Sequence, residues 1–318
     1  MQALPLSPMH RVRSYDTRIF YRSEYLSEVS EQGYRHVFDT QKARRICEAL
    51  LEEDLISRAD LLAARPLTEE DLLLVHTPAY LEEIRRPATL ARLLLLDPAH
   101  PWDGRLLQPF LYAAGGTLAA ARLAADRNCI GFNLGGGYHH AQADKAEGFC
   151  AIADVAIAVR DLQDRGAATH VLIVDLDCHH GNGNAEIFSN DETVFTFSMH
   201  NGNWCWITKR NHLDVELPTH AGDEIYLEAL RAHLPRILDT FRPDFVAYVA
   251  GSDPFVGDSL GDLDVSEQGM LWRDRFVTEQ VRRRAIPLLV VTAGGYGVES
   301  WRIHFNYLRW LLRDAGLS

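Results

Sequence analysis

Hydrophobic residues along the chain form short continuous runs and longer stretches with helical spacing. The short runs lack clean alternation, which is typical of strands buried on both faces of a parallel sheet. They are Cys129–Phe132, Val171–Val174, Val194–Phe197, Phe245–Val249 and Leu288–Val291. The longer stretches predict helices at residues 40–64, 107–127, 152–164, 223–240, 266–284 and 299–313. Because strands and helices alternate, we predict an α/β fold: a single domain over residues 1–318, with an open, mostly parallel sheet flanked by helices on both faces.

The composition of the 318-residue chain is that of an ordinary globular protein, with 47% hydrophobic and 24% charged residues. The 44 acidic and 32 basic side chains give a formal charge of −12. This balance argues against nucleic acid as the main partner, because a phosphate backbone would be repelled. It is compatible with a basic substrate, such as a lysine-containing peptide or a polyamine.

The cysteines and the N-terminal residues bear on the compartment. Five cysteines occur without a CxxC pair, which indicates a reducing environment and no disulfide framework. The first residues lack the charged region of a signal peptide, and Pro5 and Pro8 interrupt any apolar stretch. The longest leucine run, Leu93–Leu96, is far too short to span a bilayer. We therefore expect a cytoplasmic protein without membrane contact.

Polar residues cluster directly after each of the predicted strands. In chain order the clusters read GGGYHH, DLDCHHGNG, SMH, AGSD and AGGY. Open α/β sheets place their ligands in the crevice at the carboxyl ends of the strands. We therefore expect these five clusters, distant in sequence, to meet at one edge of the sheet.

Two of these clusters contain residues that suit a divalent metal. In an extended segment, Asp175, Asp177 and His179 would point to the same side. Carboxylates and an imidazole together are suitable ligands for Zn²⁺. Asp253 follows another strand and would complete a site of three protein ligands that leaves room for water and substrate. The alternatives are a polar strand exit at 175–179 and a helix-capping role for Asp253, which precedes Pro254.

Two further clusters contain candidate catalytic groups. His139 and His140 follow a triple glycine, and imidazoles titrate near neutral pH. One could act as a general base and the other as an acid or electrostatic partner. Tyr296 lies among glycines, and its phenol could donate a hydrogen bond to a developing oxyanion. The alternatives are two partly exposed loop histidines and a tyrosine that packs on a glycine turn.

The order of these motifs resembles the zinc-dependent histone deacetylase family, which has the arginase-deacetylase fold. The likeness covers most of the chain, and its opening and its GNG are closest to the class IV group and its bacterial relatives. The motifs are His36-Val-Phe-Asp39, Val75-His-Thr77 with Tyr80, GGGYHHA, Glu147-Gly-Phe-Cys150, VDLDCHHGNG, Phe197-Ser-Met-His200, AGSDPFVGDSLGDL and AGGY.

The resemblance implies one catalytic Zn²⁺ and a histidine dyad. Asp177, His179 and Asp253 match the zinc ligands of the family. His139 and His140 match its dyad, with His140 at the position of the general base.

The resemblance also implies supporting roles around this centre. Tyr296 matches the tyrosine that polarises the scissile carbonyl, and Asp175 matches the residue that orients the first histidine of the dyad. Asn182 stands where many relatives have Asp, and a neutral amide would stabilise a protonated base less. Asp175, Ser198 and Met199 match contributors to a structural monovalent-cation site for K⁺ or Na⁺, Met199 through its carbonyl.

The walls of the substrate tunnel follow from the same resemblance. Gly148 and Phe149 match one wall, where the glycine carbonyl can accept the substrate N–H. The opposite wall departs from the family pattern, and either Trp204 or Trp206 is expected to line it. Ala293 also departs, because relatives frequently have glycine there.

These features predict hydrolysis of an acylated amine, either acyl-lysine in a protein or peptide or an acylpolyamine. Two alternatives stay open. One is a binding protein of the same fold without turnover. The other is a binuclear manganese ureohydrolase, although Cys178-His-His and the neutral Asn182 supply a second hard-metal site poorly. Acyl-chain length and oligomeric state are not indicated by the sequence.

Overall fold

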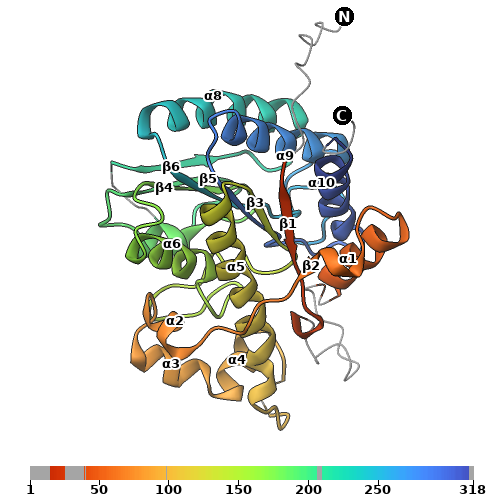
Figure 1. Ribbon diagram of the computed structural model, residues 1–318. Helices are drawn as coiled ribbons and strands as arrows, with labels where there is room; N and C mark the ends of the chain where they lie inside the picture. Colours follow the sequence, from red (N-terminus) through yellow and green to blue (C-terminus); the bar gives the residue numbers. More distant parts are fainter. Residues whose placement is uncertain (1–14, 26–38, 40, 98, 206–209, 315–318) are drawn as a thin grey trace, which may run out of the picture.

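The computed structural model describes residues 15–25, 39, 41–97, 99–205 and 210–314, and within them eight strands form one sheet (Figure 1). The order is β2-β1-β3-β8-β7-β4-β5-β6, and every neighbouring pair is parallel. The strands are β1 (Thr17–Phe20), β2 (Leu61–Leu62), β3 (Ile130–Asn133), β4 (Val171–Asp175), β5 (Val194–His200), β6 (His212–Glu216), β7 (Phe245–Val249) and β8 (Leu288–Val291). The predicted α/β class with an open parallel sheet is confirmed.

Helices cover both faces of the sheet. On one side lie α5 (Gln108–Arg127) and α6 (Asp154–Asp164), together with the short helices α2 (Glu69–Leu73), α3 (Pro78–Ile84) and α4 (Pro87–Leu93). On the other lie α1 (Lys42–Glu52), α8 (Asp223–Phe241), α9 (Glu267–Arg282) and α10 (Ser300–Asp314). The helix α7 (Asn182–Ile187) follows β4. None of the helices in these described ranges has the length and apolar character needed to cross a membrane.

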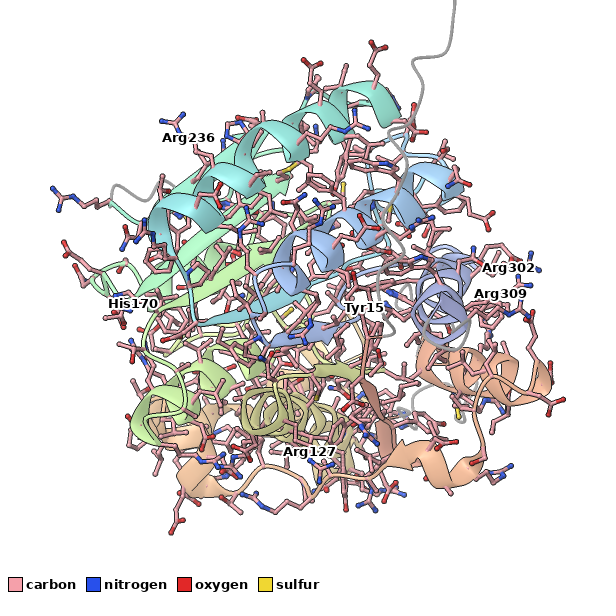
Figure 2. The ribbon with its side chains drawn as sticks, turned by 45° about the horizontal axis from the view of Figure 1, so that its top comes forward. Tyr15, Arg127, His170, Arg236, Arg302 and Arg309 are labelled. Atoms are coloured by element: carbon pink, nitrogen blue, oxygen red, sulfur yellow. The ribbon has the colours of Figure 1, made fainter. Side chains whose placement is uncertain are left out.

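The central strands contribute side chains to two separate cores. In β4, Val171 and Ile173 pack under α5 and α6, whereas Leu172 and Val174 pack under α8 and α9. Both faces are therefore apolar, which explains the runs without alternation. Arg236 of α8 and Arg302 of α10, in contrast, extend from the outer surfaces of their helices in Figure 2.

The helix predicted over residues 40–64 is wrong beyond Glu52. The chain turns there because Asp54 adopts a left-handed conformation with φ of 52°, and the N–H of Leu55 bonds back to the carbonyl of Leu50. This is the hydrogen-bond pattern that ends many helices, with aspartate in place of the usual glycine. A short 3₁₀ helix, Arg58–Asp60, and strand β2 follow.

The edge strands were not predicted from the sequence. Among the described strands, β6 pairs only with β5, and its residues alternate between polar and apolar, unlike the buried runs. Strand β2 has only two residues, and β1 reads Thr-Arg-Ile-Phe, which mixes polar and apolar positions and contains no continuous apolar run. The sequence therefore indicated the centre of the sheet and not its margins.

Candidate metal centre and active site

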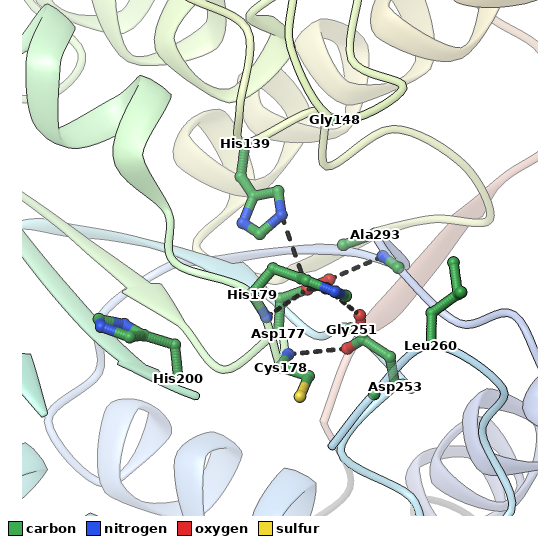
Figure 3. Close-up of polar contacts among 12 residues, drawn as sticks. His139, Gly148, Asp177, Cys178, His179, His200, Gly251, Asp253, Leu260 and Ala293 are labelled. Atoms are coloured by element: carbon green, nitrogen blue, oxygen red, sulfur yellow. Dashed lines mark hydrogen bonds and ion pairs between the residues drawn. The ribbon is translucent and has the colours of Figure 1, made fainter. Parts of the chain in front are cut away.

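Three potential metal ligands meet at the ends of two neighbouring strands. Asp177 and His179 follow β4, and Asp253 follows β7. Nδ1 of His179 lies 2.8 Å from Oδ2 of Asp253 and 3.2 Å from Oδ1 of Asp177. Figure 3 shows the three side chains pointing toward one another, and their ligand atoms all lie within 4.8 Å of each other. The fold thus assembles the residues that the sequence proposed as zinc ligands.

Backbone N–H groups from neighbouring loops hold the two carboxylates. Oδ2 of Asp177 accepts a hydrogen bond from the N–H of Gly294 at 2.8 Å, and Oδ1 of Asp253 accepts one from Cys178 at 2.8 Å. A Cβ at Gly251 or Gly294 would collide with a carboxylate, so only glycine lets the loops come this close. Each carboxylate therefore has one oxygen held by a neighbouring loop and the other directed at the imidazole. Oδ1 of Asp177, on the imidazole side, also accepts the N–H of His179 at 3.0 Å.

The donor set of this group fits zinc. Burial opposes protonation of His179, but the carboxylates of Asp177 and Asp253 outweigh it and raise the pKa of His179 to about 11. Burial opposes ionisation of Asp177 too, yet the neighbouring imidazoles hold its pKa well below the ordinary value. Burial and then the charge of Asp177 raise the pKa of Asp253 to about 7, so two ionised carboxylates are stable here only with positive charge between them. One imidazole nitrogen and two carboxylate oxygens form a ligand set suited to a catalytic zinc site.

A buried arginine lies behind the strand ends that supply the ligands. Arg273 of α9 is fully buried and pairs with Asp274 at 2.8 Å. Its guanidinium donates to the carbonyls of Leu176, at 3.1 Å, and of Ala250 and Gly251, at 3.3 and 2.7 Å. One side chain thus joins the end of β4 to the end of β7.

The two histidines that follow β3 differ in their partners. Nδ1 of His139 lies 2.8 Å from Oδ2 of Asp175, whereas Nδ1 of His140 lies 2.7 Å from Oδ1 of Asn182. Burial lowers the pKa of both rings. At His139 the charges of Asp175 and Asp177 outweigh burial and raise the pKa to about 9. At His140 burial and the charge of His139 leave the pKa well below its ordinary value, so His140 is the ring able to accept a proton.

Tyr296 lies beside the candidate metal centre, in the loop after β8. Its ring centroid is 6.0 Å from that of His179, with the planes at 90°. Its N–H donates to Oδ2 of Asp258 at 2.6 Å. Burial and then the charges of Asp177 and Asp253 raise the pKa of Tyr296 well above its ordinary value. The phenol therefore keeps its proton and can donate a hydrogen bond.

The loop before Tyr296 has an unusual backbone and a buried lysine. Ala293 adopts φ of 46°, a left-handed conformation that costs a residue other than glycine about 1–2 kcal/mol. Nζ of Lys42 donates to the carbonyls of Ala293 and Gly294 at 2.6 and 2.8 Å. The sequence did not single out Lys42 or Asp258. Two features of the sequence could have indicated them: Lys42 lies on the apolar face of a predicted helix, and Asp258 lies within a motif of the matched family.

Two of the expected tunnel walls lie against the dyad. A Cβ at Gly148 would collide with the ring of His140, and the Phe149 ring lies 6.2 Å from that of Tyr296. The indole of Trp204 stacks flat on His140, with centroids 4.0 Å apart and planes at 3°. Their role as walls stays a prediction. Trp206 and residues 36–38 of the first motif lie outside the described residues.

The monovalent-cation site stays a prediction as well. Asp175 and Ser198 are paired in the β4–β5 ladder, and Met199 follows in the sheet, fully buried. Ser198 Oγ accepts from the N–H of Gly181 at 3.3 Å and lies 2.8 Å from Nδ1 of His200. The three residues are therefore adjacent, as that expectation requires.

A second group of metal-ligating residue types, His180, His200 and Asp214, lies next to the first. Nδ1 of His180 accepts the N–H of Trp204 at 3.1 Å, so its proton is on Nε2, which lies 3.1 Å from Oδ2 of Asp214. Nε2 of His212 lies 2.7 Å from the same oxygen. The contact of His212 is a hydrogen bond, whereas Nε2 of His180 approaches the oxygen in poor hydrogen-bond geometry. Because Asp214 is already partnered by His212, the arrangement favours a polar network over a metal site.

The tautomer of His200 supports the same conclusion. Nδ2 of Asn203 donates to Glu216 at 2.7 Å, which turns Oδ1 of Asn203 toward Nε2 of His200, 2.7 Å away. Nε2 of His200 must therefore carry a proton to donate. The sequence did not predict this network, because Asp214 belongs to the edge strand β6.

Comparisons with known proteins cover nearly the whole chain. A sequence model of the histone deacetylase domain matches residues 36–308. An uncharacterized protein of Picosynechococcus sp. is 38% identical over 283 residues, which cover 87% of this chain and 91% of that protein. Histone deacetylase 2 of Arabidopsis thaliana is 33% identical, covering 93% and 79%. The acetoin utilization protein AcuC of Staphylococcus aureus is 27% identical, covering 85% and 74%.

The same likeness extends to a solved structure. The crystal structure of the HDA15 HD domain superposes with a TM-score of 0.79 at 27% identity, covering 95% of this chain and 90% of that one.

Proposed function

The chain belongs to the histone deacetylase family, and on that premise we propose that it is a zinc-dependent hydrolase that removes an acyl group from an acylated amine, foremost acyl-lysine in a peptide or protein. The family consists of deacetylases, so hydrolysis is its expected activity. What supports the finer proposal is one observation. Asp177, His179 and Asp253 converge within 4.8 Å of one another, directly beside His140 and Tyr296.

Asp177, His179 and Asp253 would hold the zinc ion. When bound, zinc supplies a Lewis acid that polarises the amide carbonyl and lowers the pKa of the attacking water.

The groups of the chain then divide the proton transfers. Nε2 of His140 would accept the proton of the attacking water, since Nδ1 is engaged by Asn182. The phenol of Tyr296 would donate to the carbonyl oxygen as its charge grows. A protonated imidazole of the dyad would return a proton to the departing amine, because an amine anion is a very poor leaving group. The products are a carboxylate and a free amine.

The surroundings of these groups would position the acylated amine. The carbonyl of Gly148 would accept the substrate N–H, and the rings of Phe149 and Trp204 would flank the chain that enters. The 43% exposure of Trp204 supports placing its stacked indole at the opening. A monovalent ion, K⁺ or Na⁺, bound near Asp175 and Ser198 would support the loops from behind.

The test is a metal analysis combined with a substrate panel on the purified full-length chain. The panel contains acetyl-lysine and longer acyl-lysine peptides and an acetylpolyamine, since relatives include both histone deacetylases and AcuC. We expect one zinc per chain and turnover of at least one acyl-lysine peptide, abolished in Asp253→Ala. If the zinc-loaded protein hydrolyses only acetylpolyamines, its substrates are acylpolyamines and not acyl-lysine. Loaded protein that hydrolyses nothing would instead support a binding role.

A further inference from the structure

A chain of two hydrogen bonds leads from the dyad to Glu147. Oδ1 of Asn182 lies 2.7 Å from Nδ1 of His140, and Nδ2 of Asn182 donates to Oε2 of Glu147 at 2.9 Å. Asn182 is 2% exposed, so its amide has no solvent alternative. The remaining neighbours of Oε2 are weaker: Nε2 of Gln142 at 3.5 Å and Nζ of Lys145 at 3.6 Å.

The carboxylate of Glu147 determines which way the amide of Asn182 faces. An ionised carboxylate only accepts hydrogen bonds, so it must face the NH₂ group and not the oxygen. The amide oxygen is then turned toward His140. An oxygen at this place can only accept, so Nδ1 of His140 carries the proton and Nε2 holds a free lone pair. The reversed amide would place the proton on Nε2 and leave it unable to accept one.

Glu147 also belongs to the turn that presents the tunnel wall. Its N–H and carbonyl pair with those of Cys150 at 3.3 and 2.8 Å, which closes a tight turn at Gly148 and Phe149. Both turn residues have positive φ, 53° and 62°. The side chain that orients the amide and the residues that flank the substrate therefore share one rigid turn.

We propose that Glu147 is a positioning residue for the hydrolysis: through Asn182 it keeps His140 in the tautomer that accepts a proton at Nε2. The inference rests on the proposed function, in which His140 is the general base. It also accounts for the neutral Asn182. A carboxylate at position 182 would hold the proton on Nδ1 of His140 directly. Here the carboxylate is that of Glu147, and the amide of Asn182 lies between it and His140.

The experiment compares Glu147→Ala in the wild type and in an Asn182→Asp background. In the wild type we expect kcat to fall about tenfold or more, as is typical when an outer partner of a catalytic group is removed, while KM stays nearly constant. Glu147→Gln keeps an acceptor oxygen and should restore part of the loss. In the Asn182→Asp background the effect should reverse, because Glu147 then faces another carboxylate and its removal relieves repulsion.

Glu186→Ala is the matched control. It removes the same charge from an exposed position of α7, the helix that begins at Asn182, and should leave kcat unchanged. Zinc content and thermal unfolding verify that every variant is folded. Equal kcat values for Glu147→Ala and the control, or losses of the same sign in both backgrounds, would overturn the proposal.

A second readout does not depend on turnover. Nitrogen-15 NMR of the histidine rings should show the Nδ1–H tautomer of His140 in the wild type and a shift toward Nε2–H in Glu147→Ala. An unchanged tautomer would refute the role of Glu147. If no variant hydrolyses any acylated substrate, the proposed function fails, and the NMR measurement still decides the tautomer.

Discussion

Two neighbouring groups of histidine and aspartate residues differ in charge and in the position of their imidazole protons. One contains His179 and the other contains the next residue, His180. In the first, Nδ1 of His179 lies 2.8 Å from Oδ2 of Asp253 and 3.2 Å from Oδ1 of Asp177. In the second, His180 and His212 face Asp214 at 3.1 and 2.7 Å. Distances and residue types are therefore nearly the same. Spacing alone cannot tell a metal centre from a hydrogen-bonded network.

The difference lies in charge and in tautomers. The first group brings two buried carboxylates to one imidazole, so a net negative charge is left for a cation. The second has one carboxylate for two imidazoles, and the proton of His180 is fixed on Nε2 because Trp204 occupies Nδ1. A nitrogen that carries a proton cannot ligate a metal. At His180 the partner on the far side of the ring thus decides what the near side can do.

The largest expected effect separates the two groups by metal content. Asp253→Ala should lose the zinc and all turnover, because one of three ligands is gone. Asp214→Ala should retain one zinc per chain. Elemental analysis of both purified variants measures this directly. Loss of zinc from Asp214→Ala, or two zinc ions per wild-type chain, would show that the second group is also a metal site and would contradict the comparison.

Tyr296→Phe tests the first group without touching its ligands. The variant should fold and keep its zinc, and kcat should fall by about 10²–10³, since one donor to the oxyanion is lost. The effect should appear in kcat more than in KM, because the hydrogen bond strengthens as charge develops. Steady-state kinetics on an acetylated substrate measures the loss. A wild-type kcat would leave Tyr296 as a packing residue.

Trp204 lies between the two groups. Its backbone N–H donates to His180 of the second group, and its indole stacks on His140 and lies 6.1 Å from the ring of His179 of the first group. Trp204→Ala removes the ring and keeps the N–H, so the network should persist while the opening widens. The ratio of kcat/KM for long over short acyl chains should change, and one misfitting methylene is worth about 1–3 kcal/mol. Hydrogen exchange at residues 199–205 serves as the control for the network. An unchanged ratio would mean that the indole does not line the tunnel.

The smallest effect concerns pH and the second group alone. Burial opposes ionisation of Asp214, but contacts with the imidazoles of His180 and His212 outweigh it and hold the pKa of Asp214 below its ordinary value. A lowered pKa in the folded state stabilises the protein above the unfolded-state value of about 3.9, and this stability is lost as the pH falls. The stability advantage of the wild type over Asp214→Asn should therefore shrink below about pH 4. Urea unfolding of both proteins across this range measures it, and a constant advantage would contradict the assignment.

The sequence anticipated the parts of the site that lie directly after buried strands. Asp177 and Asp253 could be predicted from the sequence because parallel strands end at one edge of a sheet, and the fold does bring these two residues together. The contacts of Glu147 and Lys42, and the stacking of Trp204 on His140, could not be predicted, because they depend on loop conformations such as the positive φ at Ala293 and Phe149. The single domain, the cytoplasmic location and the roles of the site residues stay predictions.

The guanidinium of Arg273 has a consequence for how zinc and folding are coupled. In small zinc domains the metal assembles its own site, so binding and folding are one event. Here Arg273 hydrogen-bonds from within the core to the carbonyls of Leu176, Ala250 and Gly251. Backbone N–H groups also hydrogen-bond to the carboxylates of Asp177 and Asp253. The ligands are preorganised by folding itself. On the proposed zinc binding, metal affinity would therefore depend on the core packing around α9, and substitutions far from the ligands would tune metal exchange without altering the ligand set.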